Sequence, residues 1–138
     1  MITVVDPNDQ PRLARLSEAH ANAFERGWST VEIETLADRG LLIADDADAF
    51  ALFSVAVDES ELLTVVTPPS LRRSGRGRRL LQAAYPMLRA RSATAIFLEV
   101  AEPNEAAQRL YLSEGFEVIG RRKKYYGPVD AIVMRRSV

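Results

Sequence analysis

The sequence predicts one domain of the α/β (α+β) class over residues 1–138, with a mixed seven-stranded sheet flanked by about four helices. Segments with apolar residues at helical spacing alternate with short runs typical of strands, and no linker, repeat or low-complexity stretch separates them. A chain of 138 residues with 47% hydrophobic and 27% charged residues is also long and apolar enough to bury its own core.

The amino-terminal half is expected to form a short strand, two helices and three antiparallel strands. Apolar residues at helical spacing from Leu13 to Ala23 indicate the first helix, which Gly27 should end. Ser29 and Glu32 have the spacing of a capping box, which favours the start of a second helix. The expected elements are a strand at 2–5, helices from about 7 to the low twenties and at 29–37, and strands at 41–44, 49–57 and 62–67.

The carboxyl-terminal half is expected to add two helices and three strands. A turn containing Gly75 and Gly77 opens a helix that runs to about residue 91, although Pro86 inside it must cost a backbone hydrogen bond or kink it. Asn104 is typical of a helix cap, and Gly115 of a helix end. The remaining expected elements are a strand at 95–101, a helix at 104–114 and strands at 116–126 and 130–135.

The composition excludes several kinds of chemistry. The sequence has no cysteine and one histidine, His20, so it excludes disulfides, structural zinc, thiolate catalysis and any Ser-His-Asp triad not built on His20. We expect His20 to be a surface or capping residue. The Asp-rich segment 45–48 lacks the glycine and the final glutamate of a calcium loop, so it predicts a hairpin turn and no metal. The first residues carry no basic segment or long apolar stretch, and no apolar run is long enough to span a bilayer, so we expect a cytoplasmic protein without a membrane partner.

Charge is divided unevenly between the two halves. Residues 1–71 carry four arginines against thirteen acidic residues, a net charge of −9, whereas residues 72–138 carry fourteen Lys and Arg against six acids, a net charge of +8. Five of these arginines lie in residues 72–79, just before a helix, where free amides and the helix dipole favour an anion. The segment is no Walker A motif, and Leu80 replaces the third glycine of GxGxxG. It suits either a pyrophosphate with a further phosphate or a nucleic-acid backbone.

The motif Arg72-x-x-Gly75-x-Gly77, between a strand and a helix, resembles the acetyl-CoA loop of the GCN5-related N-acetyltransferases (GNAT). Further motifs between residues 61 and 134 resemble the RimI-type N-terminal protein acetyltransferases of that superfamily, and Trp28-Ser29 is a weaker match. These motifs are Glu61-Leu62-Leu63-Thr64, Phe97-Leu98-Glu99-Val100, Asn104-Glu105-Ala106-Ala107, Leu110-Tyr111, Gly115-Phe116, Gly120-Arg121-Arg122 and Tyr125-Tyr126. The sequence departs from the family pattern at Thr67-Pro68, Ser74, Arg76 and Pro86.

The resemblance implies a sheet splayed between its fourth and fifth strands, acetyl-CoA as cosubstrate and no metal. Amides from Arg73 to Arg78 would surround the pyrophosphate, and amides near Val65 and Val66 would meet the pantetheine and the thioester oxygen. Asn104 would cap a helix and contact the pantetheine. The expected cofactor-binding residues are Val65, Val66, Arg72, Arg73, Ser74, Gly75, Arg76, Gly77, Arg78 and Asn104.

Two residues are candidates for acid–base catalysis. Glu99 interrupts an apolar strand, where a carboxylate needs either a partner or a function. The resemblance makes it the general base, acting through water; the alternative is a salt-bridged strand residue. Tyr111 lies two turns after the cap of its helix, and the resemblance makes it the general acid for the departing thiolate; the alternative is a core aromatic.

The expected function is direct transfer of acetyl from acetyl-CoA to the α-amino group of a protein, and the resemblance includes ribosomal proteins among the acceptors. An α-amine, with a pKa near 8 against about 10.4 for lysine, needs less help from a carboxylate base. Trp28, Tyr125 and Tyr126 are the expected substrate-binding residues, and some of Glu25, Glu32 and Glu34 are expected to line the peptide entrance and favour basic peptides.

Two alternatives remain open at this point. One is a GNAT enzyme that acetylates a small amine or a lysine side chain, because loops set the substrate pocket in this fold. The other is a nucleic-acid-binding module, from which we expect aromatics interleaved with the arginines, and none lies among residues 72–79. We expect a monomer or a weak dimer that binds no nucleic acid.

Overall fold

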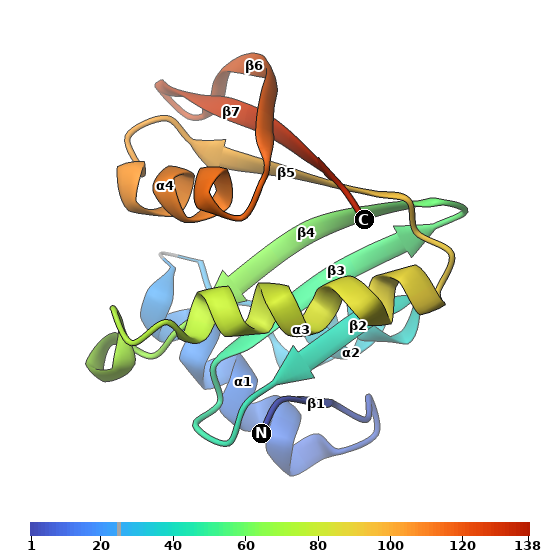
Figure 1. Ribbon diagram of the computed structural model, residues 1–138. Helices are drawn as coiled ribbons and strands as arrows, with labels where there is room; N and C mark the ends of the chain where they lie inside the picture. Colours follow the sequence, from blue (N-terminus) through green and yellow to red (C-terminus); the bar gives the residue numbers. More distant parts are fainter. Residues whose placement is uncertain (25) are drawn as a thin grey trace.

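The protein forms one seven-stranded sheet in the order β1-β2-β3-β4-β5-β7-β6, with helices on both faces (Figure 1). The computed structural model describes residues 1–24 and 26–138, and only the backbone of Tyr125 and Tyr126. The elements are β1 (Thr3–Val4), α1 (Gln10–Ala23), α2 (Thr30–Asp38), β2 (Gly40–Ala44), β3 (Phe50–Ala56), β4 (Glu59–Val66), the 3₁₀ turn η1 (Pro69–Leu71), α3 (Arg76–Ala90), β5 (Ala95–Ala101), α4 (Glu105–Ser113), β6 (Glu117–Tyr126) and β7 (Val129–Ser137).

The sheet opens between β4 and β5, as predicted. These two strands form the one parallel pair between the strands described, and they are in register only over Glu59–Glu61 and Ala95–Phe97. Beyond these residues the strands diverge, while β5 continues in antiparallel register with β7 as far as Ala101. Backbone groups at the ends of β4 and β5 therefore face an opening instead of a neighbouring strand.

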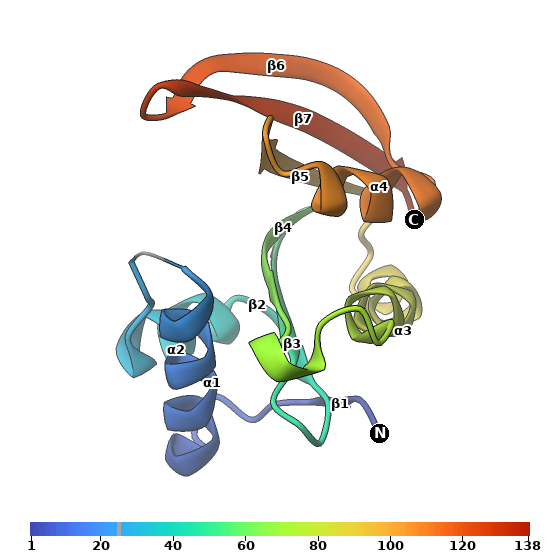
Figure 2. The same ribbon diagram turned by 90° about the vertical axis from the view of Figure 1, so that its left-hand side faces the viewer.

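Two apolar cores lie on opposite faces of β1–β4. Alternation along β2 places Leu41 and Ile43 in the core under α3, and Leu42 and Ala44 in the core under α1 and α2. Figure 2 shows this arrangement, with α1 and α2 on one side of these strands and α3 on the other. The core under α3 continues into β5, β7 and Tyr111 of α4, so it joins the two halves of the splayed sheet.

The predicted order of strands and helices is confirmed, with differences at their ends. Strand β4 begins three residues earlier than expected. The turn η1 was not predicted, because Pro68-Pro69 indicates a break in the sequence pattern, yet proline also suits the first turn of a helix. Helix α3 continues past Pro86 to Ala90, since Pro86 lies on the exposed side, where water can reach the unpaired carbonyl.

The Asp-rich segment forms a hairpin turn between β2 and β3, as predicted. Oδ1 of Asp45 accepts hydrogen bonds from the amides of Ala47 and Ala49, at 2.9 and 3.1 Å. Within residues 1–24 and 26–138, no helix is long and apolar enough to cross a membrane. The part of the chain that the structure describes also holds no group of three or more His, Asp or Glu residues placed to bind a metal ion.

Candidate active site

The start of α3 presents free backbone amides. Gly75 caps the helix with a φ of +79°, a conformation that suits glycine, and the first bond of the helix runs from the amide of Arg79 to the carbonyl of Gly75. The amides of Arg76, Gly77 and Arg78 come before this bond, so the helix supplies no acceptor for them. Together with the helix dipole they form a site for an anion.

Gly77 leaves this site open. A Cβ added there would lie 3.4 Å from Leu110 of α4 and 4.0 Å from Val65 of β4. All three residues line a cavity of about 670 Å³, which we call the α3 cavity. It is also lined by Val66, Arg72, Arg73, Gly75, Arg76, Arg78 and Asn104. Nine of the ten predicted cofactor-binding residues therefore surround one cavity.

Ser74 is the exception among the predicted cofactor-binding residues. Its hydroxyl donates to the carbonyl of Leu71, so it closes the turn after η1. The described residues that line the α3 cavity do not include it. Sequence position alone could not show this, because an ST-type turn and a phosphate ligand use the same hydroxyl.

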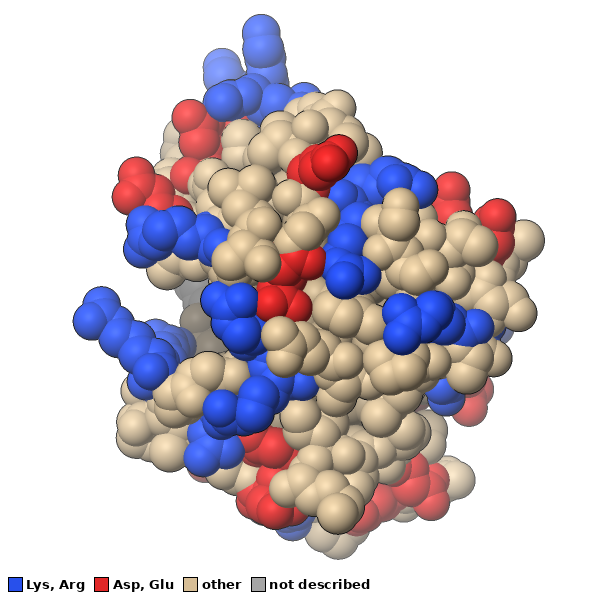
Figure 3. All heavy atoms as spheres, in the orientation of Figure 1, with Lys and Arg blue, Asp and Glu red and all other residues tan. Residues whose placement is uncertain are grey.

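Two arginines at the start of α3 are paired with acidic side chains. Arg76 Nη1 lies 2.7 Å from Asp45 Oδ2, and Arg78 Nη1 lies 2.8 Å from Glu114 Oε2. At these two positions the backbone amide is free for an anion, while one Nη1 of each guanidinium is held by a carboxylate. The pair with Asp45 gives Arg76, one of the departures from the family pattern, a structural role. Lys and Arg side chains gather along the side of the molecule on which α3 begins (Figure 3).

A second cavity, of about 590 Å³, occupies the opening between β4 and β5, and we call it the splay cavity. It shares Phe24, Val65, Asn104 and Ala107 with the α3 cavity, so the two adjoin. Its other lining residues are His20, Arg26, Trp28, Leu62, Leu63, Thr64, Leu98, Glu99, Val100, Ala101 and Tyr111. An anion site at one end thus leads to a partly apolar chamber at the other.

Glu99 lies on the wall of the splay cavity. Its side chain is 15% exposed, and its Oε1 is 2.9 Å from Nε of Arg122 on β6. The neighbours Leu98 and Val100 are buried in the core under α3, and strand alternation places the less buried Glu99 on the other face of β5. Both sequence interpretations thus describe part of the geometry, because this carboxylate is ion-paired and also borders the cavity.

Tyr111 lies on the α4 side of the same cavity. Its side chain is buried, and its ring packs edge-to-face against Phe116 with ring centroids 5.8 Å apart. It also belongs to the core under α3, so the core interpretation and the catalytic one coexist. Asn104 caps α4 by accepting a hydrogen bond from the amide of Ala107.

The prediction for His20 as a surface or capping residue is wrong. Its imidazole is 3% exposed and stacks between Phe24 and Trp28, with centroid distances of 4.5 and 4.4 Å. The signal in the sequence was the spacing, because Leu13, Leu16 and His20 recur on one face of α1. Together with Phe24, Arg26 and Trp28, His20 places the end of α1 and the following loop against the splay cavity.

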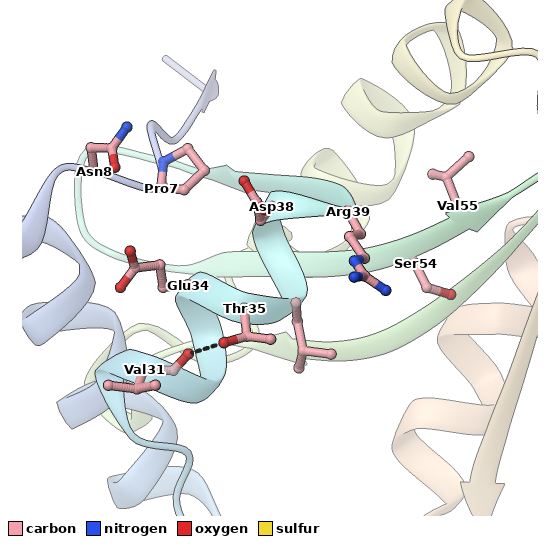
Figure 4. A pocket seen from close by; sticks show the side chains of 10 residues that line it. Pro7, Asn8, Val31, Glu34, Thr35, Asp38, Arg39, Ser54 and Val55 are labelled. Atoms are coloured by element: carbon pink, nitrogen blue, oxygen red, sulfur yellow. Dashed lines mark hydrogen bonds between the residues drawn. The ribbon is translucent and has the colours of Figure 1, made fainter.

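Two of the three acidic residues expected at the peptide entrance, Glu32 and Glu34, are not among the described residues that line the splay cavity. Glu34 accepts a hydrogen bond from Gln10 and lines another cavity, of about 830 Å³, beside α2 (Figure 4). Glu32 is engaged by Arg26 and by the amide of Ser29 in the capping box. Glu25 and the side chains of Tyr125 and Tyr126 lie outside the described residues.

Comparison with known proteins agrees with this geometry. The family model described as "Acetyltransferase (GNAT) family" matches residues 13–116. The [ribosomal protein bS18]-alanine N-acetyltransferase of Salmonella typhimurium is 33% identical over 140 residues, covering 96% of this chain and 94% of that one.

Solved structures share the fold over the full length of the chain. The ribosomal-protein-S18-alanine N-acetyltransferase of Escherichia coli has a TM-score of 0.82 and 29% identity, covering 100% of this chain and 93% of that one. The aminoglycoside 6'-N-acetyltransferase of Enterococcus faecium has a TM-score of 0.86 and 18% identity, covering 99% of this chain and 96% of that one. This similarity shows a common fold. The chain therefore belongs to the acetyltransferase (GNAT) family of acetyl-CoA-dependent N-acetyltransferases.

Proposed function

We propose that this enzyme acetylates the α-amino group of a protein amino terminus and that a ribosomal protein is among its acceptors. The observation that carries the proposal is that Glu99 and Tyr111 line one cavity, which adjoins the anion site at the start of α3. The 33% identical relative named for the alanine of ribosomal protein bS18 supports the choice of acceptor.

The residues present fit acetyl-CoA, which supplies the activated acetyl thioester when bound. The amides of Arg76, Gly77 and Arg78 would hold the pyrophosphate, because they lack helical acceptors and Gly77 leaves room for close approach. Val65 and Asn104 line both cavities, and Val66 lines the α3 cavity next to Val65, so these three residues would hold the pantetheine.

Glu99 and Tyr111 would divide the proton transfers. As the amine nitrogen bonds to the acetyl carbon, Glu99 accepts the amine proton, directly or through water, and Tyr111 donates a proton to the sulfur as the carbon–sulfur bond breaks. Direct transfer needs no cysteine, and the sequence contains none. The lining of the cavity also fits an amine, because a carboxylate beside apolar walls can accept a hydrogen bond from it.

A panel of acceptors tests the proposal, with product identified by mass spectrometry and free thiol followed as acetyl-CoA is consumed. One peptide has a free amino-terminal alanine, and its twin has a blocked terminus and a free lysine. An aminoglycoside represents small amines, because the fold is shared with an enzyme named for that substrate. We expect acetylation of the free α-amine alone, and faster turnover of the blocked peptide or the aminoglycoside would overturn the assignment.

A further inference from the structure

Trp28 is held to α1 by three contacts. Its amide donates to Nδ1 of His20 at 3.1 Å, and its carbonyl accepts from the hydroxyl of Ser17 at 2.6 Å. Its indole ring lies nearly parallel to the imidazole of His20, with ring centroids 4.4 Å apart and an angle of 15° between the planes. Both Trp28 and His20 line the splay cavity, so these contacts determine the shape of one of its walls.

The hydrogen bond from Trp28 requires a neutral imidazole. Because Nδ1 accepts the amide proton, the single ring proton of neutral His20 lies on Nε2. Protonation would place a second N–H on Nδ1, and two donors would then face each other across 3.1 Å. The charged form must therefore give up the amide of Trp28, and with it one of the contacts that hold the loop.

The surroundings of His20 favour the neutral form at pH 7. Burial lowers the pKa of His20 below 6.5. The negative charge of Glu32 on α2 raises this pKa, but by less than burial lowers it, and the positive charge of Arg26 lowers it further. Glu99 of β5 lines the same cavity, and its carboxylate is paired with Arg122 of β6. Phe24 of α1 and Phe50 of β3 complete the apolar surroundings of the ring.

We propose that His20 is a positioning residue for the acceptor: its neutral imidazole holds Trp28 in place, and protonation releases Trp28 and weakens acceptor binding. The inference rests on the proposed function, because it takes the splay cavity as the acceptor site. His20 acts through Trp28 and takes no part in the proton transfers, so acetyl-CoA binding should not respond to its protonation.

The first test uses fluorescence and needs neither substrate. Trp28 is the one tryptophan in the sequence, so its emission reports directly on the ring stacked against it. We expect the emission to change in one step below pH 6.5. This step should vanish in His20→Asn, which offers an amide oxygen near the place of Nδ1 but does not titrate. Emission that varies identically in the two proteins would overturn the proposal.

The second test measures the acceptor KM between pH 5 and 8 for parent and variants. The readout is the KM of the parent divided by the KM of His20→Asn, because this ratio cancels titration of the peptide amine. We expect the ratio to rise about 3- to 10-fold as the pH falls below 6.5, which corresponds to the loss of one hydrogen bond. His20→Phe keeps an aromatic ring without an acceptor atom, so it should show the raised KM at every pH. Ser17→Ala loosens the same loop without adding or removing a titrating group, so its KM should exceed that of the parent by the same factor at every pH.

Several outcomes separate this inference from the proposed function. A KM ratio that stays flat, or an acetyl-CoA KM that rises with it, would overturn the positioning role. Circular dichroism identifies a variant that fails to fold, and the fluorescence step in the parent then remains the test. Absence of any acetylated peptide from the parent at pH 8, with the fluorescence step intact, would instead overturn the choice of acceptor.

Discussion

The guanidinium Nε of Arg122 lies 2.9 Å from Oε1 of Glu99, so an ion pair connects β6 with the carboxylate on β5. Strand β7 runs between them, with Ala131 opposite Arg122 and Val133 opposite Glu99. The side chain of Arg122 thus reaches across a whole strand to hold Glu99 at the cavity wall. A carboxylate held in one orientation can receive a proton without first being reoriented.

Glu99→Gln is expected to reduce kcat about 100- to 10,000-fold, the range typical of a lost general base. The affinity for acetyl-CoA should stay nearly unchanged, because Glu99 lines the splay cavity and is not among the described residues that line the α3 cavity. Steady-state kinetics and calorimetry measure the two effects separately. Glu61→Gln is a matched control, since Glu61 is an exposed carboxylate on β4. A kcat within a factor of about two of the parent would show that Glu99 is structural.

Tyr111→Phe removes one hydroxyl and keeps the ring that packs against Phe116. If the hydroxyl protonates the leaving sulfur, kcat should fall about 100-fold or more while the fold stays intact. A second cosubstrate checks the role, because a thioester with a more acidic thiol needs less protonation and should lose less activity in the variant. An equal loss with both thioesters would argue against Tyr111 as the acid.

The elements that position the site could be predicted because they follow from local patterns. The capping box of Ser29 and Glu32, the cap at Asn104 and the glycine turn before α3 are short-range signals, and all three are present. Glu99 stood out because a carboxylate is rare in an apolar strand. These signals need no knowledge of the tertiary structure.

The pairings around the site could not be predicted, because they depend on packing between distant segments. Asp45 and Arg76 are 31 residues apart in the sequence, and the Arg122–Glu99 pair depends on the register of β6 against β7. That register shifts after Arg122, and Lys124 adopts a φ of +53°. The stacking of His20 on Trp28 likewise depends on how the loop folds back after α1.

Gly77→Val is expected to weaken acetyl-CoA binding without unfolding the protein. The nearest atoms to an added Cβ belong to Leu110 and Val65, at the ordinary contact distances of 3.4 and 4.0 Å, so the folded protein can hold the new side chain. The valine would instead occupy space in the α3 cavity that the cofactor needs. Calorimetry should show an affinity loss of at least about 10-fold, equal to 1.4 kcal/mol. Gly120→Val is the matched control, since a Cβ at Gly120 meets nothing within 4 Å. Equal affinities in the parent and Gly77→Val would remove Gly77 from the site.

Asp45→Asn should make stability less dependent on pH in acid. Burial alone would raise the pKa of Asp45, but hydrogen bonds from Arg76 and from the amides of Ala47 and Ala49 outweigh it and lower this pKa below 3.8. The resulting stability is present above about pH 3.8 and is lost as pH falls through the lowered pKa. Urea unfolding should show the variant about 1–3 kcal/mol less stable than the parent at pH 7, with a smaller difference at pH 3. A constant difference would contradict this.

Arg122→Met is expected to lower kcat about 10- to 100-fold, because a carboxylate that loses its partner spends less time in the reactive orientation. Arg122→Lys restores a charge but not the planar fork of the guanidinium, so it should recover part of the lost activity. The acetyl-CoA KM should not change in either variant, since Arg122 contacts Glu99 beside the splay cavity and not the start of α3. Double-mutant kinetics complete the test: with Glu99→Gln already present, Arg122→Met should cost little more, because the two side chains act as one unit. Losses that multiply independently would mean that Arg122 supports the enzyme by a route other than Glu99.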